Sequence, residues 1–219
     1  MVNGVHGTLS TGTMGWQRIK MYINEIFKVP VYETKLDLDI EELNSFCNGY
    51  EKADKGRTKS NVSGYQSNNL ILDKQPIKNL VKEIEKHSSA FAKEFINNNK
   101  QVVTDMWLNI NEYKDSNRLH NHPTCDIAGV YYTKTPVDCG NIRFVHPAWD
   151  VLSYYYEYQQ ERTEANEYNS EEWFFEPLEN VLFLFPAWLN HYVTPNNNKE
   201  ERRISISFNT KTKLRGGRW

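Results

Sequence analysis

Hydrophobic and polar positions along this chain follow two different periods, one typical of helices and one typical of strands. Between residues 76 and 97 apolar residues recur every three or four positions, as at Ile77, Leu80 and Ile84. This spacing places them on one face of a helix. The pattern predicts one long amphipathic helix, with Pro76 in its first turn.

The chain before this helix is more mixed. Apolar and polar residues alternate through much of 23–38, which predicts a strand or strand pair. Asp39 stands where a helix N-cap belongs, so a short helix is expected over 40–49. The polar stretch 51–69 contains two glycines and many Ser and Asn residues, and it predicts a long loop with at most one short strand.

After residue 101 the period changes to two, and the apolar runs become rich in β-branched and aromatic residues. Strands are expected over 102–111, 126–133, 140–145, 173–175, 181–185 and 203–208. Helices first and many short strands afterwards predict an α+β protein with a double-stranded β-helix core of jelly-roll or cupin-like type. We expect the N-terminal helices to pack on its major sheet.

A chain of 219 residues is long enough for one domain with a sizeable core. We expect an N-terminal extension over 1–22, a catalytic domain over 23–210 and a basic C-terminal tail over 211–219. The 26 basic and 28 acidic side chains leave a net charge of −2. A broad positive field for nucleic acid is therefore missing, and a nucleic-acid partner is disfavoured.

The chain has three cysteines, Cys47, Cys125 and Cys139. Their number is odd, and no two of them have C-x-x-C spacing. This argues against a disulfide framework or a structural zinc ribbon and favours a reducing compartment. Neither an apolar run of about 18 residues nor a secretory leader pattern is present, so membrane and secretion classes are disfavoured. The expected location is the cytoplasm, or the host cytoplasm if the gene is carried by a phage.

Three histidines carry the most specific chemical signal. His120 and His122 are two residues apart, so in an extended chain their side chains point to the same face. His191 follows much later, in Phe-Pro-Ala-Trp-Leu-Asn-His. A third imidazole from a distant strand would close one face of an octahedral ion and leave positions free for substrate and oxygen.

Arg203 begins a strand in which alternation separates two faces. Arg203, Ser205 and Ser207 share one face, and the apolar residues between them share the other. A guanidinium and hydroxyls would then face a cavity. A planar guanidinium matches a carboxylate with two parallel hydrogen bonds, which lysine cannot do.

The segment 107–132 contains His-Asn-His-Pro at 120–123 and Gly-Val-Tyr-Tyr at 129–132. Together with 177–196 and 201–209, it resembles the Fe(II)/2-oxoglutarate-dependent oxygenases, in particular a phage and bacterial branch with an H-x-H-P signature. The resemblance spans about residues 23–210 and rests on the order and spacing of the motifs. No single short motif in it is decisive.

The resemblance implies a double-stranded β-helix that binds Fe(II) through His120 and His191 and anchors the far carboxylate of 2-oxoglutarate on Arg203. It implies O2 as cosubstrate, succinate and CO2 as products, hydroxylation as the usual outcome and ascorbate as an optional reductant. Ser205 belongs to the same cofactor-binding face. Tyr131 or Tyr132, whichever faces inward, would add a phenol to the carboxylate site, and Asn109 is expected to line the pocket.

Most members of the superfamily carry H-x-D, whereas this chain has His122 at the second position. Three arrangements are open. His120, His122 and His191 form an all-imidazole triad, or Asp126 joins two histidines as the third ligand, or only two histidines bind and water or chloride completes the set.

The leading hypothesis is an oxygenase that hydroxylates a C–H bond of a peptide, an amino acid or another small polar substrate. The alternative is a cupin-like metal-binding protein or non-oxidative metalloenzyme on the same barrel, because three imidazoles also suit zinc. The loops that would select the substrate, expected over 51–69 and 148–172, carry no readable code. N-terminal elements could pair two copies in a homodimer, which the sequence does not demonstrate.

Overall fold

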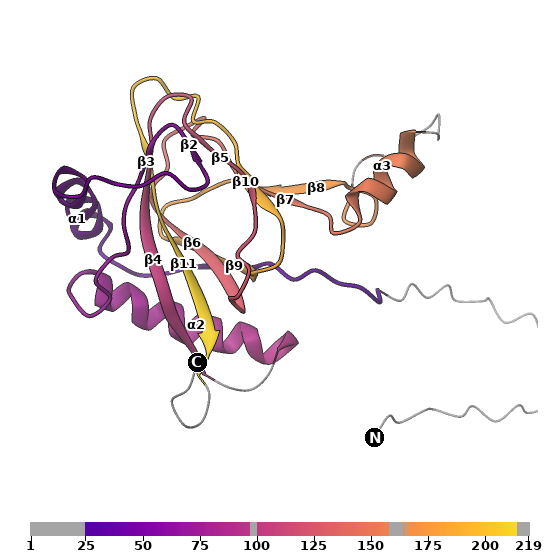
Figure 1. Cartoon of the computed structure of the whole chain (residues 1–219), viewed down its shortest axis with the longest axis horizontal. Helices are drawn as coiled ribbons and strands as arrows, with labels where there is room; N and C mark the ends of the chain where they lie inside the picture. Colours follow the sequence, from indigo (N-terminus) through magenta and orange to yellow (C-terminus); the bar gives the residue numbers. More distant parts are fainter. Residues whose placement is uncertain (1–24, 97–99, 158–163, 165, 214–219) are drawn as a thin grey trace, which may run out of the picture.

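Two antiparallel sheets face each other (Figure 1). The computed structural model describes residues 25–96, 100–157, 164 and 166–213. The expected extension 1–22 and residues 214–219 of the expected tail lie outside the described residues. Within the described part, no helix is both long and apolar enough to cross a membrane.

The major sheet has six strands in the order β1, β9, β6, β11, β4, β3. Their bounds are β1 Tyr32–Lys35, β9 Val181–Pro186, β6 Ile127–Lys134, β11 Arg203–Thr212, β4 Gln101–Asn111 and β3 Tyr65–Gln66. The minor sheet has five strands in the order β2, β5, β10, β7, β8. Their bounds are β2 Asn61–Val62, β5 Ser116–His120, β10 His191–Val193, β7 Ile142–Val145 and β8 Glu172–Phe175. The predicted double-sheet, α+β fold is confirmed.

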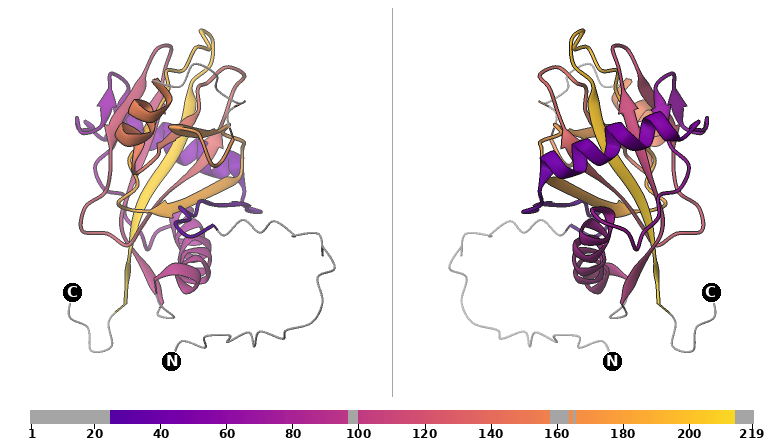
Figure 2. Two further views of the ribbon diagram at one scale, coloured as in Figure 1. Left: turned by 90° about the vertical axis from the view of Figure 1, so that its right-hand side faces the viewer. Right: turned by 90° about the vertical axis from the view of Figure 1, so that its left-hand side faces the viewer.

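Helices α1 (Ile40–Ala53) and α2 (Ile77–Phe95) cover the outer face of the major sheet (Figure 2). Asp39 caps α1 as predicted, since its carboxylate accepts a hydrogen bond from the Glu42 backbone N–H at 2.9 Å. The position of α1 and α2 on the major sheet agrees with the expected packing of the N-terminal helices. The helices hide the outer face from water and leave the inner face to the site.

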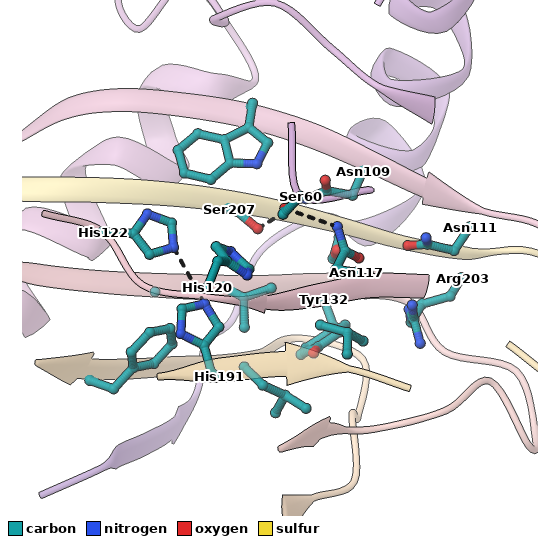
Figure 3. Close-up of a pocket in the computed structure, with 17 residues that line it drawn as sticks. Ser60, Asn109, Asn111, Asn117, His120, His122, Tyr132, His191, Arg203 and Ser207 are labelled. Carbon is teal, nitrogen blue, oxygen red and sulfur yellow. Dashed lines mark hydrogen bonds between the residues drawn. The ribbon is translucent and has the colours of Figure 1, made fainter. Parts of the chain in front are cut away.

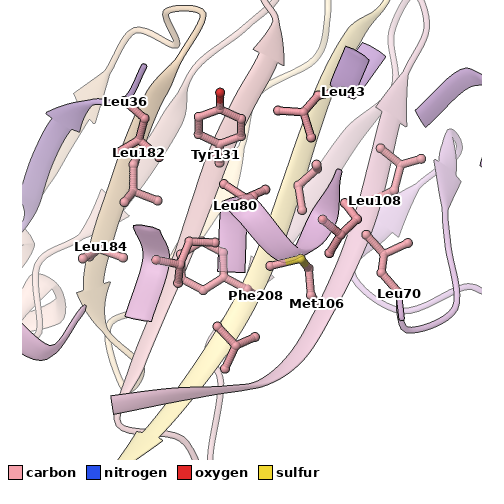
Figure 4. Packing of buried hydrophobic residues seen from close by; sticks show 14 of the residues in the cluster. Leu36, Leu43, Leu70, Leu80, Met106, Leu108, Tyr131, Leu182, Leu184 and Phe208 are labelled. Atoms are coloured by element: carbon pink, nitrogen blue, oxygen red, sulfur yellow. The ribbon is translucent and has the colours of Figure 1, made fainter. Parts of the chain in front are cut away.

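Alternation along the central strands divides their side chains between two cores. The outer core lies between the helices and the major sheet (Figure 4) and includes Leu80 of α2, Met106 and Leu108 of β4, and Phe208 of β11. Ile204 and Ile206 of β11 belong to it as well, as the period of two predicted. Burial of these side chains is the main stabilising contribution to this half of the fold.

The inner core lies between the two sheets and is dominated by aromatic and β-branched residues. It contains Val130 and Tyr132 of β6, Phe144 of β7, and Phe183 and Phe185 of β9. It fills only part of the space between the sheets. The remaining space is lined by polar residues and forms the candidate site.

Four differences from the sequence expectation concern strand and helix bounds. The strand expected over 23–38 is only β1, α1 continues to Ala53, and the loop 51–69 contains the short strands β2 and β3. β11 runs to Thr212, two residues beyond the expected domain end. Its last residues pair with the start of β4 and gain backbone hydrogen bonds there.

Strands β5 and β10 and helix α3 (Trp149–Glu157) were not predicted. β5 escapes a period-two search because it directs polar Asn117 and His120 into the pocket, and β10 escapes it because it is only three residues long. The segment 148–172 was expected to be a loop. The backbone N–H of Ala148 donates to the His146 ring Nδ1 at 3.0 Å, just before α3 begins at Trp149.

Candidate active site between the sheets

Neighbouring strands of the minor sheet bring two of the histidines together. His120 is the last residue of β5, and His191 is the first residue of β10. The two are directly opposite in the antiparallel register, so their side chains leave the sheet on the same face. Their ring centroids are 4.4 Å apart.

His122 lies just beyond β5 and returns to the same point. Its backbone N–H donates to the Ala187 carbonyl at 2.8 Å, and the Asn121 amide donates to the Asn190 side chain at 2.9 Å. Its ring stacks on Trp107 with centroids 5.7 Å apart. The segment after β5 is thus tied to the segment before β10, which orients His122 toward His191.

The three imidazoles are close enough to share one ion (Figure 3). Their candidate ligand nitrogens all lie within 4.8 Å of one another, and the Nε2 atoms of His122 and His191 are 3.3 Å apart. Adjacent ligands on an octahedral ion with bonds of about 2.1 Å are separated by about 3 Å. The group therefore has the size of a mononuclear site.

Backbone carbonyls select the tautomer of two of these rings. His120 Nδ1 lies 2.7 Å from the Arg118 carbonyl, and His191 Nδ1 lies 2.9 Å from the Leu189 carbonyl. A carbonyl oxygen only accepts, so each Nδ1 carries the hydrogen and each Nε2 keeps its lone pair. Such a second hydrogen bond is a regular feature of metal-ligating histidines.

Burial keeps all three rings neutral near pH 7. Desolvation and the neighbouring His120 lower the pKa of His122 to about 4. Desolvation also lowers the pKa of His120, and it lowers the pKa of His191 well below the usual value. Neutral imidazole is the form that binds metal, so protons do not compete with a cation at physiological pH.

These shifts predict how the metal-free protein responds to acid. Between pH 6.5 and about pH 4 the unfolded chain binds protons at histidines that stay neutral in the folded state, so stability falls as pH falls. The expected loss is roughly 1.4 kcal/mol per pH unit for each such histidine. Urea denaturation with a chelator present measures it, and His122→Asn should reduce the slope. Equal slopes in both proteins would contradict the prediction.

Arg203 lies at the other end of the pocket, at the start of β11 (Figure 3). Only 1% of its surface is exposed. Among the described residues no carboxylate forms an ion pair with it, and its Nε and one terminal nitrogen are buried without a hydrogen-bond partner. Burial lowers its pKa. A buried cation with unused donors indicates a site for an anion.

A glycine turn holds the remaining donor of Arg203. One terminal nitrogen donates to the Cys139 carbonyl and to the Thr194 carbonyl, the latter at 3.4 Å. Gly140, with φ of 78°, follows Cys139, and a Cβ at this position would lie 2.5 Å from the Thr194 carbonyl oxygen. Only glycine fits there. The turn fixes the guanidinium and leaves its other edge free.

Polar side chains connect the two ends of the pocket. Ser205 and Ser207 of β11 line it as predicted, together with Asn109 of β4 and Tyr132 of β6. The Asn109 amide donates to Ser207 Oγ at 3.0 Å, while its Oδ1 is buried without a partner. Desolvation raises the pKa of Tyr132 to about 12, and the nearby Arg203 opposes the rise.

Tyr131 faces away from the pocket, so of the two tyrosines only Tyr132 is placed to serve. Tyr131 lies in the outer core and donates its hydroxyl to the Asn180 side chain. A cofactor-binding role for Tyr131 is therefore wrong for this fold, because adjacent strand residues point to opposite faces.

The structural role of Tyr131 gives a stability prediction. Tyr131→Phe removes a buried hydrogen bond and leaves the Asn180 oxygen with only a 3.4 Å contact from the Leu38 N–H. The variant should lose about 1–2 kcal/mol of unfolding free energy in denaturant titrations. Its affinity for 2-oxoglutarate should be unchanged. A weaker affinity in a stable variant would place the phenol in the pocket after all.

Asp126 does not join the histidines. Its carboxylate accepts hydrogen bonds from the Thr212 backbone and hydroxyl at 2.6 Å and 2.5 Å, and from the Gln101 amide at 3.3 Å. It lies outside both the histidine group and the pocket lining. Asp126 as an alternative third metal ligand is therefore wrong for this structure, because its carboxylate connects the end of β11 to the start of β4.

Ser60, Trp107 and Asn117 are among the lining residues that sequence reasoning did not single out. Trp107 could have been found, since it shares the parity of Asn109 on β4. Ser60 could not, because it belongs to the loop 51–69. The Asn117 amide lies 3.4 Å from Ser60 Oγ, and the Arg118 N–H donates to the Ser60 carbonyl at 2.9 Å.

Comparisons with known proteins agree with this geometry. Residues 105–209 match the family described as "Putative 2OG-Fe(II) oxygenase". The crystal structure of a Pseudomonas putida prolyl-4-hydroxylase is similar, with a TM-score of 0.60 at 11% identity over 85% of this chain and 94% of the other. No curated protein shows significant sequence similarity to this chain.

Two further solved structures have the same fold. The carbocyclase SnoK from nogalamycin biosynthesis has a TM-score of 0.60 at 11% identity, over 84% of this chain and 80% of the other. HygX from Streptomyces hygroscopicus, solved with nickel and 2-oxoglutarate bound, has a TM-score of 0.58 at 9% identity, over 85% and 84%. Residues 105–209, just under half of the chain, thus match an Fe(II)/2-oxoglutarate oxygenase family, and the chain shares its fold with solved structures described as α-ketoglutarate- or 2-oxoglutarate-binding enzymes.

Proposed function

We propose that the protein is an Fe(II)- and 2-oxoglutarate-dependent oxygenase that hydroxylates a C–H bond of a peptide, an amino acid or another small polar molecule. The observation that carries the proposal is the pairing of two features in one pocket. Three neutral imidazoles lie at one end of the pocket. At the other end lies the buried guanidinium of Arg203, which forms no ion pair with a described carboxylate. This pair of features fits a metal and a dicarboxylic acid that spans the space between them.

The residues present fit both groups. His120, His122 and His191 would hold Fe(II), and the free edge of Arg203 with the Ser205 hydroxyl would hold the distal carboxylate of 2-oxoglutarate. When bound together, these groups supply oxidative decarboxylation of 2-oxoglutarate with O2 and the hydroxylation of a C–H bond.

The chain's own residues position the reactants and exclude water. Val130, Ile142 and Phe185 form an apolar wall of the pocket, which strengthens electrostatic contacts inside it. Asn109 keeps an acceptor oxygen directed to no protein group. A donor on the ligand, such as an amide or hydroxyl, would satisfy it.

The test is an anaerobic titration of the purified protein with Fe(II) and 2-oxoglutarate. We expect the weak visible charge-transfer band of the chelate, followed on admission of air by succinate formation. The control variant Arg202→Ala should form the same band as the wild type, since this arginine pairs with Glu51 at 2.9 Å and does not line the pocket. A folded protein that binds Fe(II) and forms no band would overturn the proposal.

A second candidate is a cupin-like metal-binding protein or non-oxidative metalloenzyme. It is favoured by one observation: the group that could hold a metal contains only histidines, which suit zinc as well as iron. Metal analysis of protein isolated without added metal, combined with a succinate assay, separates the two. Bound zinc with no succinate would favour the second candidate.

The proposed substrate is a small molecule or a peptide, and neither a membrane nor a nucleic acid is proposed as partner. We place the enzyme in a reducing cytoplasm, because Cys47, Cys125 and Cys139 are all free. A homodimer and a phage origin stay predictions from the sequence.

A further inference from the structure

The pocket differs from an H-x-D site in its charge. None of the residues that line it is an aspartate or glutamate, and Arg203 is its one charged side chain when the histidines are neutral. Asp105 and Asp115 lie outside the lining, although their charges act at longer range on His122 and Arg203, respectively. Asp105 accepts hydrogen bonds from Thr104 and Asn69, and Asp115 accepts one from the Glu112 backbone.

A charge count for the loaded site follows from these residues. A divalent metal contributes +2, Arg203 contributes +1 and doubly ionised 2-oxoglutarate contributes −2, so one positive charge is left. An aspartate at position 122 would bring the sum to zero. The surplus lies in a pocket between the two sheets, beside Trp107 and Phe185, where the lining supplies neutral polar groups but no carboxylate to offset it.

We propose that this surplus charge is neutralised by a monoanionic group bound beside the metal, with His122 as the residue that creates the preference. The chemical class is a carboxylate of the substrate or a small inorganic monoanion. The inference deepens the proposed function, because it rests on a divalent metal at the three histidines. Where the monoanion is a substrate carboxylate, it narrows the expected substrate from any small polar molecule to an acidic one.

The test uses Co(II) as a spectroscopic metal. Co(II)-loaded protein is titrated with azide or chloride as inorganic anions, with acetate as a carboxylate and with acetamide as its neutral match, first without and then with 2-oxoglutarate. Absorption of the Co(II) centre reports binding without turnover. Tighter binding of acetate than of the inorganic anions points to a substrate carboxylate, and the reverse order to a free anion.

Three variants isolate the effect of charge. His122→Asp should weaken azide binding at least about tenfold, because a unit charge within about 4 Å acts on the anion in a medium of low polarity. His122→Gln keeps the donor neutral and should stay within about threefold of the wild type. His146→Asp is the control for the substitution itself, since His146 lies outside the pocket and should have no effect.

The outcomes are distinguishable. Failure to bind Co(II) would overturn the proposed function as well. Normal Co(II) binding with equal azide affinity in wild type and His122→Asp would overturn the charge inference alone. If His122→Asp does not retain Co(II), the wild-type comparison decides, and equal spectral responses to acetate and acetamide would reject the inference.

Discussion

Arg203→Met is expected to weaken 2-oxoglutarate binding by about a hundredfold or more while leaving the ligand-free protein at least as stable as the wild type. The two effects have opposite causes. With ligand present, the guanidinium would make charge-assisted hydrogen bonds to a buried carboxylate, and losing such contacts costs about 2–5 kcal/mol. Without ligand, the wild type contains a buried cation that forms no ion pair with any described acid.

Methionine has a similar length and no charge, so it removes this desolvation penalty in the ligand-free state. The cost is the hydrogen bonding of Arg203 to the carbonyls of Cys139 and Thr194. Calorimetric titration and thermal melting measure the two effects. Arg202→Met is the matched control, since it breaks ion pairs with Glu51 and Glu112 and a hydrogen bond to Asn48, all outside the pocket, and should leave 2-oxoglutarate binding unchanged.

A large loss of stability in ligand-free Arg203→Met would contradict this account. It would show that Arg203 serves the fold through its carbonyl contacts. Unchanged 2-oxoglutarate affinity in a folded variant would place the cosubstrate elsewhere.

His191→Ala is expected to weaken Fe(II) or Co(II) binding by at least a hundredfold and to abolish succinate formation. The ring is 4% exposed and directly opposite His120, so no other described imidazole can take its position. Loss of groups that merely orient a ligand already costs 10–100-fold in metal affinity, and loss of the ligand itself should cost more. Competition with a coloured chelator measures the affinity.

The control for this variant is His87→Ala. His87 lies on α2, where its Nδ1 contacts the Tyr32 hydroxyl at 2.9 Å, far in the fold from the pocket lining. It should bind metal like the wild type. If His191→Ala also retained full metal affinity, the three-histidine site would be wrong.

Regular spacing of apolar residues along the longer elements made much of this fold predictable. The helical face of α2, with Leu80 and Ile84, and the two faces of β11 are both present in the structure as their spacing indicated. Both elements are long and have one apolar face against a core, so their sequences must repeat. The convergence of His120 and His191 was suggested by the histidine pattern and strengthened by the resemblance, because spacing alone does not reveal the long-range pairing of β5 with β10.

Short and polar elements were the unpredictable part. β10 is three residues long, and β5 carries Asn117 and His120 toward the pocket instead of apolar residues toward a core. In β5, polar residues of the site stand where a regular strand would have apolar residues, so the alternation that predicts a strand is missing. The third ligand position was left open for a related reason, since the hydrogen bonds from Thr212 that occupy Asp126 depend on where β11 ends.

The histidines and the arginine belong to opposite sheets. His120 and His191 come from the minor sheet, and Arg203 comes from the major sheet. The span available to a bridging diacid is therefore set by how far the two layers stand apart, and packed layers do not adjust freely. Analogues one methylene shorter or longer than 2-oxoglutarate would meet one end of the pocket and miss the other, so the fold itself selects for carbon number.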